Sequence, residues 1–342
     1  MTNTVLLIYT GGTIGMGRNP QTGALEPLDF SHLLEQLPEL RFIKADVDTY
    51  QFSPAIDSSD MDPQFWARLV NLIAERYDRY DGFVILHGTD TMAYTASALS
   101  FMLENLTKPV ILTGSQLPIG QLRTDGKENL ITSIELAAAK DQQGRAVVPE
   151  VCIYFSGRLL RGNRATKKNA DGFQAFDSYN FPRLCDAGVD FVYHNHHILQ
   201  PDFTKPLKVH PQMDTNVIVF SLFPGIQQNL ISTLLTIPSI RGIVMRTFGS
   251  GNAPQNPSLA KLLREATERG VVIVNVTQCG AGHVEMGRYE TSHHLLEAGV
   301  ISGYDSTVEA AVTKLMHLQA IYDDSKTVRE KMNQSLAGEI TI

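Results

Sequence analysis

Two short apolar runs that end in polar glycine turns constrain this chain more than any other feature of its sequence. The first run, residues 5–9, leads into TGGT at 10–13, and the second, residues 83–86, leads into HGTDT at 87–91. Apolar runs of this length between turn residues are typical of buried strands in a parallel sheet. Because ligands of open α/β sheets bind beyond the carboxyl ends of the strands, we expect the two turns to converge on one site.

The rest of the first half continues this alternation of strands and helices. Asp62, followed by proline, is a typical helix start, and apolar residues recur after it at helical spacing. A second helix is predicted for residues 91–105, and a strand for residues 109–113 that ends in GSQ at 114–116. This pattern predicts an α/β fold with a larger N-terminal domain, residues 1–190, built on a doubly wound, mainly parallel sheet.

The alternation breaks at residues 191–212, where prolines and polar residues replace the apolar runs, and we interpret this segment as a linker. The pattern then resumes with strands predicted at 217–221, 242–245 and 271–275 and helices at 226–236, 258–269 and 307–321. Ser306 to Glu309 has the spacing of a capping box for the last helix. A smaller C-terminal α/β domain is therefore expected at residues 213–342.

Charge and composition narrow the choice of partners. The 342 residues are 43% apolar and carry a net charge of −7 without a basic block. Proteins that bind nucleic acid or an anionic membrane surface present clustered cations, and no segment has the apolar length of a membrane span. We therefore expect a small-molecule ligand, and neither nucleic acid nor a membrane as a partner.

The cysteines and the N-terminus indicate the compartment. Cys152, Cys185 and Cys279 form no paired motif, which argues against a disulfide framework or a structural zinc site. The N-terminus lacks the cationic segment and cleavage site of an export signal, so a reducing cytoplasm fits best. The histidines of residues 194–197 have no well-spaced carboxylate or cysteine partner, and we predict no metal site.

Thr13 is a candidate nucleophile, because a threonine hydroxyl attacks a carbonyl carbon once a neighbouring group accepts its proton. The same turn residues also form ordinary strand-to-loop connections without any chemical role. A nucleotide site is weakly indicated, since the turn lacks the Lys-Ser/Thr ending of a P-loop. The next segment, residues 15–23, combines glycine, proline and asparagine and is predicted to be a mobile loop rather than a helix. A loop of this kind can close over a strand-end site as a lid.

Three other polar clusters each have two interpretations. Thr89 and Asp90 suit an amino-acid head group or a proton relay, although Asp90 is also a good helix cap. The sequence DSSD at 57–60 is interpreted either as a binding segment for a zwitterionic ligand or as the start of the next helix. Lys167 favours loss of a proton from a hydroxyl if it lies near Thr89, and is otherwise a solvated surface lysine. The zinc-protease HExxH and α/β-hydrolase GxSxG motifs are absent.

Taken together, these motifs closely resemble those of the bacterial-type L-asparaginases. The matching sequences are TGGTIG at 10–15, DSSDM at 57–61, HGTDTM at 87–92, GSQ at 114–116, ATK at 165–167, RTFGSGNAP at 246–254 and TQC at 277–279. They occur in the same order over nearly the whole chain. Without an export signal, the chain resembles the cytoplasmic type I branch.

The resemblance implies hydrolysis of the side-chain amide of L-asparagine to L-aspartate and ammonia without a metal or organic cofactor. It implies that Thr13 attacks the amide carbon to form an acyl-enzyme, and that Thr89, Asp90 and Lys167 transfer protons or activate water. Ser58 would bind the α-carboxylate and Asp90 the α-amino group. The other substrate-binding positions implied by the resemblance are Asp57, Ser59, Thr89 and Ser115.

One segment departs from the family. Many relatives carry a tyrosine in the loop after the nucleophile, and residues 15–29 contain none. The group that takes the proton of Thr13 is therefore open between water, the Thr89–Lys167 cluster and a residue brought in by lid closure.

The resemblance further implies a homotetramer built from intimate dimers, with Asn252 reaching the active site of a neighbouring subunit. Positions of a second, regulatory asparagine site in some type I members are matched by Thr166, Arg246, Thr277 and Cys279, which implies homotropic activation. Two alternatives stay open at this point: a catalytically silent sensor for an amino acid or nucleotide, and an amidohydrolase that prefers glutamine. Asparagine and glutamine differ by one methylene group, and an enzyme often discriminates between two such substrates by only about 1–3 kcal/mol.

Overall fold

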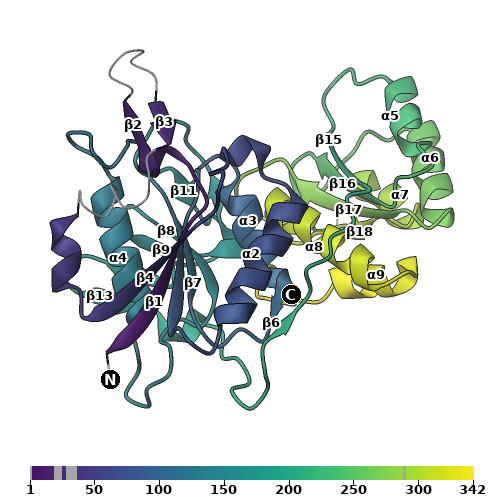
Figure 1. Ribbon diagram of the computed structural model, residues 1–342. Helices are drawn as coiled ribbons and strands as arrows, with labels where there is room; N and C mark the ends of the chain where they lie inside the picture. The colour runs from purple at the N-terminus through teal and green to yellow at the C-terminus, as the bar shows by residue number, and fades with distance from the viewer. Residues whose placement is uncertain (1, 19–24, 28–36, 288–289) are drawn as a thin grey trace. The chain divides into compact units, whose positions relative to one another are not determined.

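The protein is described by a computed structural model (Figure 1), which covers residues 2–18, 25–27, 37–287 and 290–342. Its internal contacts divide the chain into two compact units, Met1–Pro211 and Gln212–Ile342. Each unit contains a parallel or mainly parallel sheet of its own. None of the helices in these ranges is long and apolar enough to cross a membrane.

The first unit is built on an eight-stranded sheet with the order β13-β12-β9-β8-β7-β5-β1-β4. Its strands are β1 (Asn3–Tyr9), β4 (Ala45–Gln51), β5 (Gly82–Leu86), β7 (Val110–Thr113), β8 (Val151–Phe155), β9 (Arg158–Arg161), β12 (Cys185–Ala187) and β13 (Phe191–Tyr193). The strands from β4 to β8 in this order are parallel, whereas β9, β12 and β13 pair antiparallel. The predicted mainly parallel α/β fold is confirmed.

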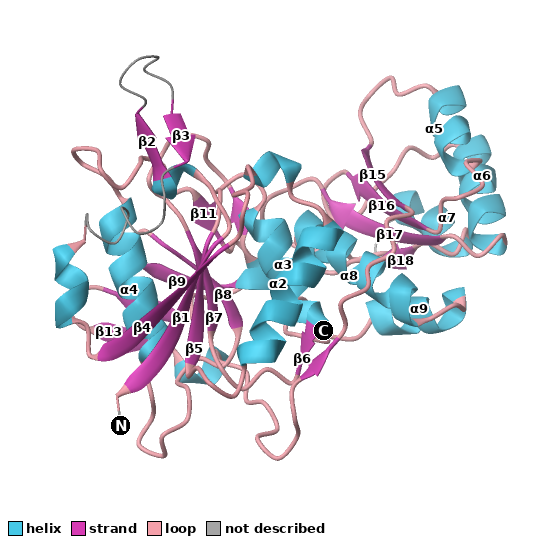
Figure 2. Ribbon diagram, viewed as in Figure 1, coloured by secondary structure: helices cyan, strands magenta, loops and turns pink. Residues whose placement is uncertain are grey.

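Helices cover both faces of this sheet, as Figure 2 shows. Helix α4 (Gly126–Ala138) packs on one face, and α2 (Pro63–Arg76) and α3 (Met92–Met102) lie on the other. Asp62 caps α2 as predicted, because its carboxylate accepts a hydrogen bond from the backbone N–H of Phe65 at 2.8 Å. Apolar side chains of α4 and the strands it covers form one core, which includes Val5, Leu7, Val84, Ile111, Leu130 and Ile134. The doubly wound arrangement brings the loops after β1, β5 and β7 to one edge of the sheet.

Short strand pairs lie outside the large sheet. They are β2 (Met16–Arg18) with β3 (Leu25–Pro27), β10 (Thr166–Lys167) with β11 (Phe176–Asp177), and β6 (Leu103–Glu104) with β14 (Lys208–Val209). Within the loop predicted for residues 15–23, residues 16–18 form the strand β2, because pairing with β3 overrides the local glycine content. Residues 19–23 of that prediction lie outside the described residues. The segment 191–212, interpreted as a linker, begins with β13 and contains β14, both within the first unit.

The second unit is built on a parallel four-stranded sheet with the order β15-β16-β17-β18. Its elements are β15 (Val217–Ser221), α5 (Gln228–Leu235), β16 (Gly242–Thr247), α6 (Pro257–Glu268), β17 (Val272–Thr277), α7 (Glu290–Glu297), β18 (Ile301–Ser302), α8 (Val308–Ile321) and α9 (Ser325–Met332). The predicted strands and helices are confirmed, while α7, β18 and α9 were not foreseen. The predicted capping box is wrong, because Thr307, not Ser306, caps α8 by accepting from the N–H of Ala310 at 3.1 Å, which places alanine and not Glu309 at the third helical position.

Candidate active site

Three loops at one edge of the large sheet lie in contact. Gly12 follows β1, and a Cβ added to it would lie 2.5 Å from the backbone nitrogen of Gly88, which follows β5. A Cβ added to Gly88 would lie 2.4 Å from the hydroxyl oxygen of Ser58. Both positions therefore require glycine, and the two strand-end turns converge as the sequence predicts.

Thr13 begins a short 3-10 turn, η1 (Thr13–Gly15), directly after two glycines. Gly11 and Gly12 have φ angles of +137° and +90°, which side-chain-bearing residues rarely adopt. Thr10 anchors the turn, because its N–H and its hydroxyl both donate to the carbonyl oxygen of Leu86, at 3.0 and 2.9 Å. The half-buried Thr13 therefore stands on a firmly held turn at the edge of the sheet.

Thr89, Asp90 and Lys167 form a hydrogen-bonded group beside this turn. Nζ of Lys167 donates to Oγ1 of Thr89 at 2.8 Å and to Oδ1 of Asp90 at 2.7 Å. The Lys167 side chain is only 18% exposed, so its interpretation as a solvated surface lysine is wrong. Asp90 does not cap α3, whose N-cap residue is Thr91. A cation at this distance makes the Thr89 hydroxyl easier to deprotonate.

The segment that contains Ser58 joins the same edge. Ser58 is buried, and its carbonyl oxygen accepts a hydrogen bond from the hydroxyl of Thr91 at 2.6 Å. Asp57 caps the short turn η3 (Ser58–Asp60) and accepts from both the N–H and the hydroxyl of Ser59 at 2.8 Å. These hydrogen bonds, first of all the one from the backbone, lower the pKa of Asp57 below its ordinary value. The segment is thus docked on the second turn and is not a helix start alone.

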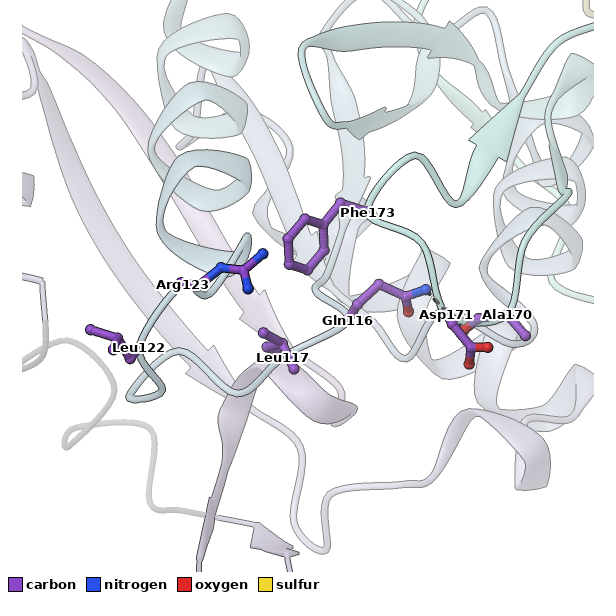
Figure 3. A pocket seen from close by; sticks show the side chains of 7 residues that line it. All are labelled: Gln116, Leu117, Leu122, Arg123, Ala170, Asp171 and Phe173. Carbon is purple, nitrogen blue, oxygen red and sulfur yellow. Dashed lines mark hydrogen bonds between the residues drawn. The ribbon is translucent and has the colours of Figure 1, made fainter.

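Ser115 and Gln116 follow β7. Ser115 is buried, and its hydroxyl donates to the carbonyl oxygen of Leu117 at 2.5 Å. Oε1 of Gln116 accepts from Oγ1 of Thr89 at 3.4 Å. The one sequence signal for this contact is the place of Gln116 directly after a strand end. Gln116 also lines a pocket of about 400 Å³ (Figure 3). The other lining residues are Leu117, Leu122, Arg123, Ala170, Asp171 and Phe173.

The buried side chain of His87 is hydrogen-bonded to the turn that follows β5. Nδ1 of His87 lies 2.7 Å from the carbonyl oxygen of Gly88, and Nε2 lies 2.9 Å from Oγ1 of Thr95. Since a carbonyl oxygen only accepts, we assign the proton to Nδ1, and Nε2 then accepts from the Thr95 hydroxyl. The indole N–H of Trp66 donates to the same Thr95 oxygen at 2.9 Å. Complete burial lowers the pKa of His87 to about 4, so the ring is neutral near pH 7.

A tyrosine does approach the loop after Thr13, but from β1. A Cβ added to Gly15 would lie 2.3 Å from the hydroxyl oxygen of Tyr9. Burial raises the pKa of Tyr9 to about 12, so its phenol keeps its proton near neutral pH and is poorly suited to accept another. Residues 19–24 and 28–29 of the segment 15–29, which contains no tyrosine, lie outside the described residues.

The second unit brings together three of the predicted regulatory positions. Arg246, Thr277 and Cys279 stand at the carboxyl ends of β16 and β17. The hydroxyl of Thr277 donates to the carbonyl oxygen of Gly249 at 2.6 Å and accepts from the N–H of Cys279 at 3.0 Å. Asn252 closes a tight loop nearby, where its N–H donates to the carbonyl oxygen of Phe248 at 2.8 Å.

The fourth regulatory position, Thr166, belongs to the first unit. It lies on β10, where it pairs with Asp177 of β11, and it directly precedes Lys167. The four predicted regulatory residues are therefore divided between the two compact units.

Comparison with known proteins places the chain in a family. Residues 4–199 match the family described as Asparaginase, N-terminal, and residues 216–332 match the Glutaminase/Asparaginase C-terminal domain. The chain belongs to the asparaginase family. L-asparaginase 1 of Escherichia coli strain K12 is 46% identical to it over 341 residues, which cover 98% of each chain.

Solved structures and other relatives agree with this asparaginase fold. The crystal structure of L-asparaginase I from Vibrio cholerae matches with a TM-score of 0.90 and 43% identity, and the match covers 100% of both chains. The 60 kDa lysophospholipase of Homo sapiens is 42% identical over 98% of this chain and 61% of that protein. Because family members carry different names, the side chains at the site must support any particular activity.

Proposed function

We propose that the chain hydrolyses the side-chain amide of L-asparagine to L-aspartate and ammonia. The observation that carries this proposal is the hydrogen-bonded group Lys167–Thr89–Asp90, which lies beside the Gly12–Thr13 turn at the carboxyl edge of the sheet. A hydroxyl nucleophile and a second hydroxyl next to a lysine are the parts that acyl transfer requires. The relatives named L-asparaginase support asparagine as the substrate.

In the first step we propose that Thr13 is the nucleophile. Its oxygen bonds to the side-chain amide carbon while its proton is taken up by the site. The carbon–nitrogen bond then breaks, the nitrogen receives a proton and leaves as ammonia, and an aspartyl ester remains on Thr13. Backbone N–H groups near Thr89 would stabilise the oxyanion, and one such donor is typically worth about 10²–10³ in rate.

In the second step a water molecule attacks the ester carbon. The Thr89–Lys167–Asp90 group takes up the proton of this water, since hydrogen bonds of 2.8 and 2.7 Å already join the three side chains. The bond between the carbon and the Thr13 oxygen then breaks, and the oxygen regains a proton. L-Aspartate leaves, and the site returns to its starting state.

The ends of the substrate are assigned to two polar segments. Ser58 would bind the α-carboxylate, and Asp90 would bind the α-amino group, with Asp57, Ser59 and Ser115 close by. The Asp90 side chain is 67% exposed, so its carboxylate is accessible to an ammonium group even while Lys167 holds one oxygen. Electrostatic pairing of this kind fixes the orientation of a small zwitterion.

Ammonia release from L-asparagine by the purified protein, without added metal, tests this proposal. Release above the uncatalysed rate supports it, and binding of asparagine without release would identify a silent sensor instead. The same assay with L-glutamine decides between the two amides. A higher kcat/KM for glutamine than for asparagine would make glutamine the preferred substrate, and the proposed mechanism of amide hydrolysis would stay the same.

We also propose that the protein acts as a cytoplasmic homotetramer built from intimate dimers, in which Asn252 reaches a neighbouring active site. Apolar side chains exposed on the second unit, among them Val219, Phe223 and Leu230, support a contact between subunits. The three cysteines are free, which fits a reducing compartment. Light scattering that gives a monomer would reject the assembly, and Asn252→Ala is expected to lower activity without changing the mass.

Finally, we propose that asparagine bound at Thr166, Arg246, Thr277 and Cys279 activates the enzyme. Nε of Arg246 is buried and has no hydrogen-bond partner within the described part of the chain, which suits an anionic ligand. Initial rates should then rise sigmoidally with asparagine, and Arg246→Met should make them hyperbolic. Hyperbolic wild-type rates with a single binding event in calorimetry would contradict this regulation.

A further inference from the structure

We infer that Gln116 is a positioning residue that sets the direction of the Thr89 hydroxyl, an inference that rests on the proposed amide hydrolysis. Gln116 lies directly after Ser115 at the end of β7. It touches Thr89 on one side and the loop of residues 169–172 on the other.

The orientation of the Gln116 amide is determined by its surroundings. Nε2 donates to the carbonyl oxygens of Ala170 at 2.9 Å and Gly172 at 3.1 Å, and Figure 3 shows the amide turned toward this loop. Both of these oxygens can only accept, so the amide nitrogen must face them. Oε1 therefore faces the opposite way, toward Oγ1 of Thr89.

Both anchors of Gln116 are held independently of Thr89. Oδ1 of Asn169 accepts from the N–H groups of Asp171 and Gly172, both at 2.9 Å, which keeps the loop carbonyls in place. The carboxylate of Asp125 accepts from the backbone N–H of Gln116 at 3.1 and 3.0 Å. The backbone and the side-chain amide of Gln116 are therefore both held in place where the side chain contacts Thr89.

This arrangement decides what the Thr89 hydroxyl does with its single proton. Lys167 donates into the Thr89 oxygen at 2.8 Å, so the hydroxyl hydrogen needs a different acceptor, and Oε1 of Gln116 is that acceptor. The remaining lone pair of the Thr89 oxygen is then free to accept a hydrogen bond from the attacking water, which orients that water. Without Gln116 the hydroxyl would rotate and present its hydrogen to the reacting groups.

The test compares Gln116→Met with Gln142→Met, in steady-state assays of ammonia release. Methionine has a similar length and makes neither hydrogen bond, while Gln142 lies exposed in the loop after α4 and serves as the matched control. Because the contact with Thr89 is long, we expect kcat of Gln116→Met to fall by roughly 3- to 10-fold, with KM changed by less than about 2-fold. The control should keep the wild-type kcat.

A second variant separates positioning from a structural role. Gln116→Glu keeps an oxygen acceptor beside Thr89 but loses the amide N–H groups that donate to the carbonyl oxygens of Ala170 and Gly172. If the acceptor is what matters, kcat of Gln116→Glu should stay closer to the wild-type value than kcat of Gln116→Met, whereas loosening of the loop by itself would lower both alike.

Three results would overturn the inference. They are a kcat of Gln116→Met equal to that of Gln142→Met, a loss that follows a fall in melting temperature, and a kcat of Gln116→Glu as low as that of Gln116→Met. A wild-type protein that releases no ammonia would overturn the proposed function together with this inference, whereas an active wild type with an unaffected Gln116→Met overturns this inference alone.

Discussion

Each compact unit contains a lysine paired with a carboxylate, and the two pairs differ in every other respect. In the second unit Lys314 and Glu339 have side chains that are 2% and 1% exposed. Nζ of Lys314 donates to Glu339 at 2.6 Å and to the carbonyl oxygens of Met332 at 2.9 Å and Gln334 at 2.5 Å. In the first unit Lys167 is 18% exposed, and its partner Asp90 is 67% exposed.

The difference shows how the surroundings decide what a lysine can do. All three N–H bonds of Lys314 are used, and Glu339 also accepts from the N–H groups of Leu336 and Ala337, so the pair fixes the C-terminal segment to α8. Nζ of Lys167 makes two hydrogen bonds within the described ranges, and one of them goes to a hydroxyl. A buried, saturated pair is structural, whereas a half-open pair beside a hydroxyl is available for proton transfer.

Within this comparison of the two pairs, the largest expected effect is the loss of catalysis in Lys167→Met. Loss of a positioned proton donor or acceptor typically lowers a rate by about 10²–10⁴-fold, and we expect kcat for ammonia release to fall within this range. The free energy of unfolding, measured by urea denaturation, should change little. A variant that keeps more than a tenth of the wild-type kcat would remove Lys167 from the mechanism.

Lys314→Met should show the opposite behaviour. Removal of one partner leaves Glu339 buried without its cation, and such losses cost about 3–5 kcal/mol of unfolding free energy. Urea denaturation measures this cost, and kcat per folded molecule should stay near the wild-type value. If unfolding is unaffected, the pair does not hold the C-terminal segment.

A pH-dependent loss of stability is expected from His87, the buried group beneath the site. Its pKa is about 4 in the folded protein against an ordinary value of 6.5, so on acidification the unfolded chain binds a proton first. The stabilisation is complete above pH 6.5 and is lost as the pH falls toward 4. Between pH 7 and pH 5 this group should contribute a fall of roughly 2 kcal/mol.

The control for this effect is His87→Asn, which keeps an N–H donor near Gly88 but does not titrate. Urea denaturation at both pH values should show a smaller fall for this variant than for the wild type. Equal falls in the two proteins would assign the pH dependence to other groups.

The smallest expected effect is that of Asp90→Asn on stability. Exposed ion pairs contribute about 0–1 kcal/mol, so this change should lower the unfolding free energy by no more than that. Glu339→Gln, the matched change in the buried pair, should cost clearly more in the same denaturation experiment. Equal costs would show that burial does not distinguish the two pairs.

Much of the fold was predictable because it depends on local patterns. The strands β1, β5 and β7 and the helix after Asp62 follow from apolar spacing and capping chemistry, and their polar ends indicated the site. The short strands such as β2 and β10 were not predictable, since they consist of two or three residues whose hydrogen bonds come from distant partners.

The candidate site was predictable as a set of segments but not as a set of contacts. Lys167 looked like a surface lysine because no local pattern shows that its chain folds back 78 residues to Thr89. For the same reason neither the anchoring of Gln116 by Ala170 nor the pairing of Lys314 with Glu339 follows from the sequence. These contacts arise only when separate elements pack.

The central claim is that Thr13 attacks the amide, and Thr13→Val tests it most directly, since valine keeps the shape of threonine without its hydroxyl. The measurement is the initial rate of ammonia release from L-asparagine by this variant and by the wild type, once the two proteins are shown to have the same melting temperature. We expect steady release by the wild type and a loss of at least about 10⁴-fold in the variant, because no other nucleophile replaces the hydroxyl. A variant that retains a tenth or more of the wild-type rate would contradict the account.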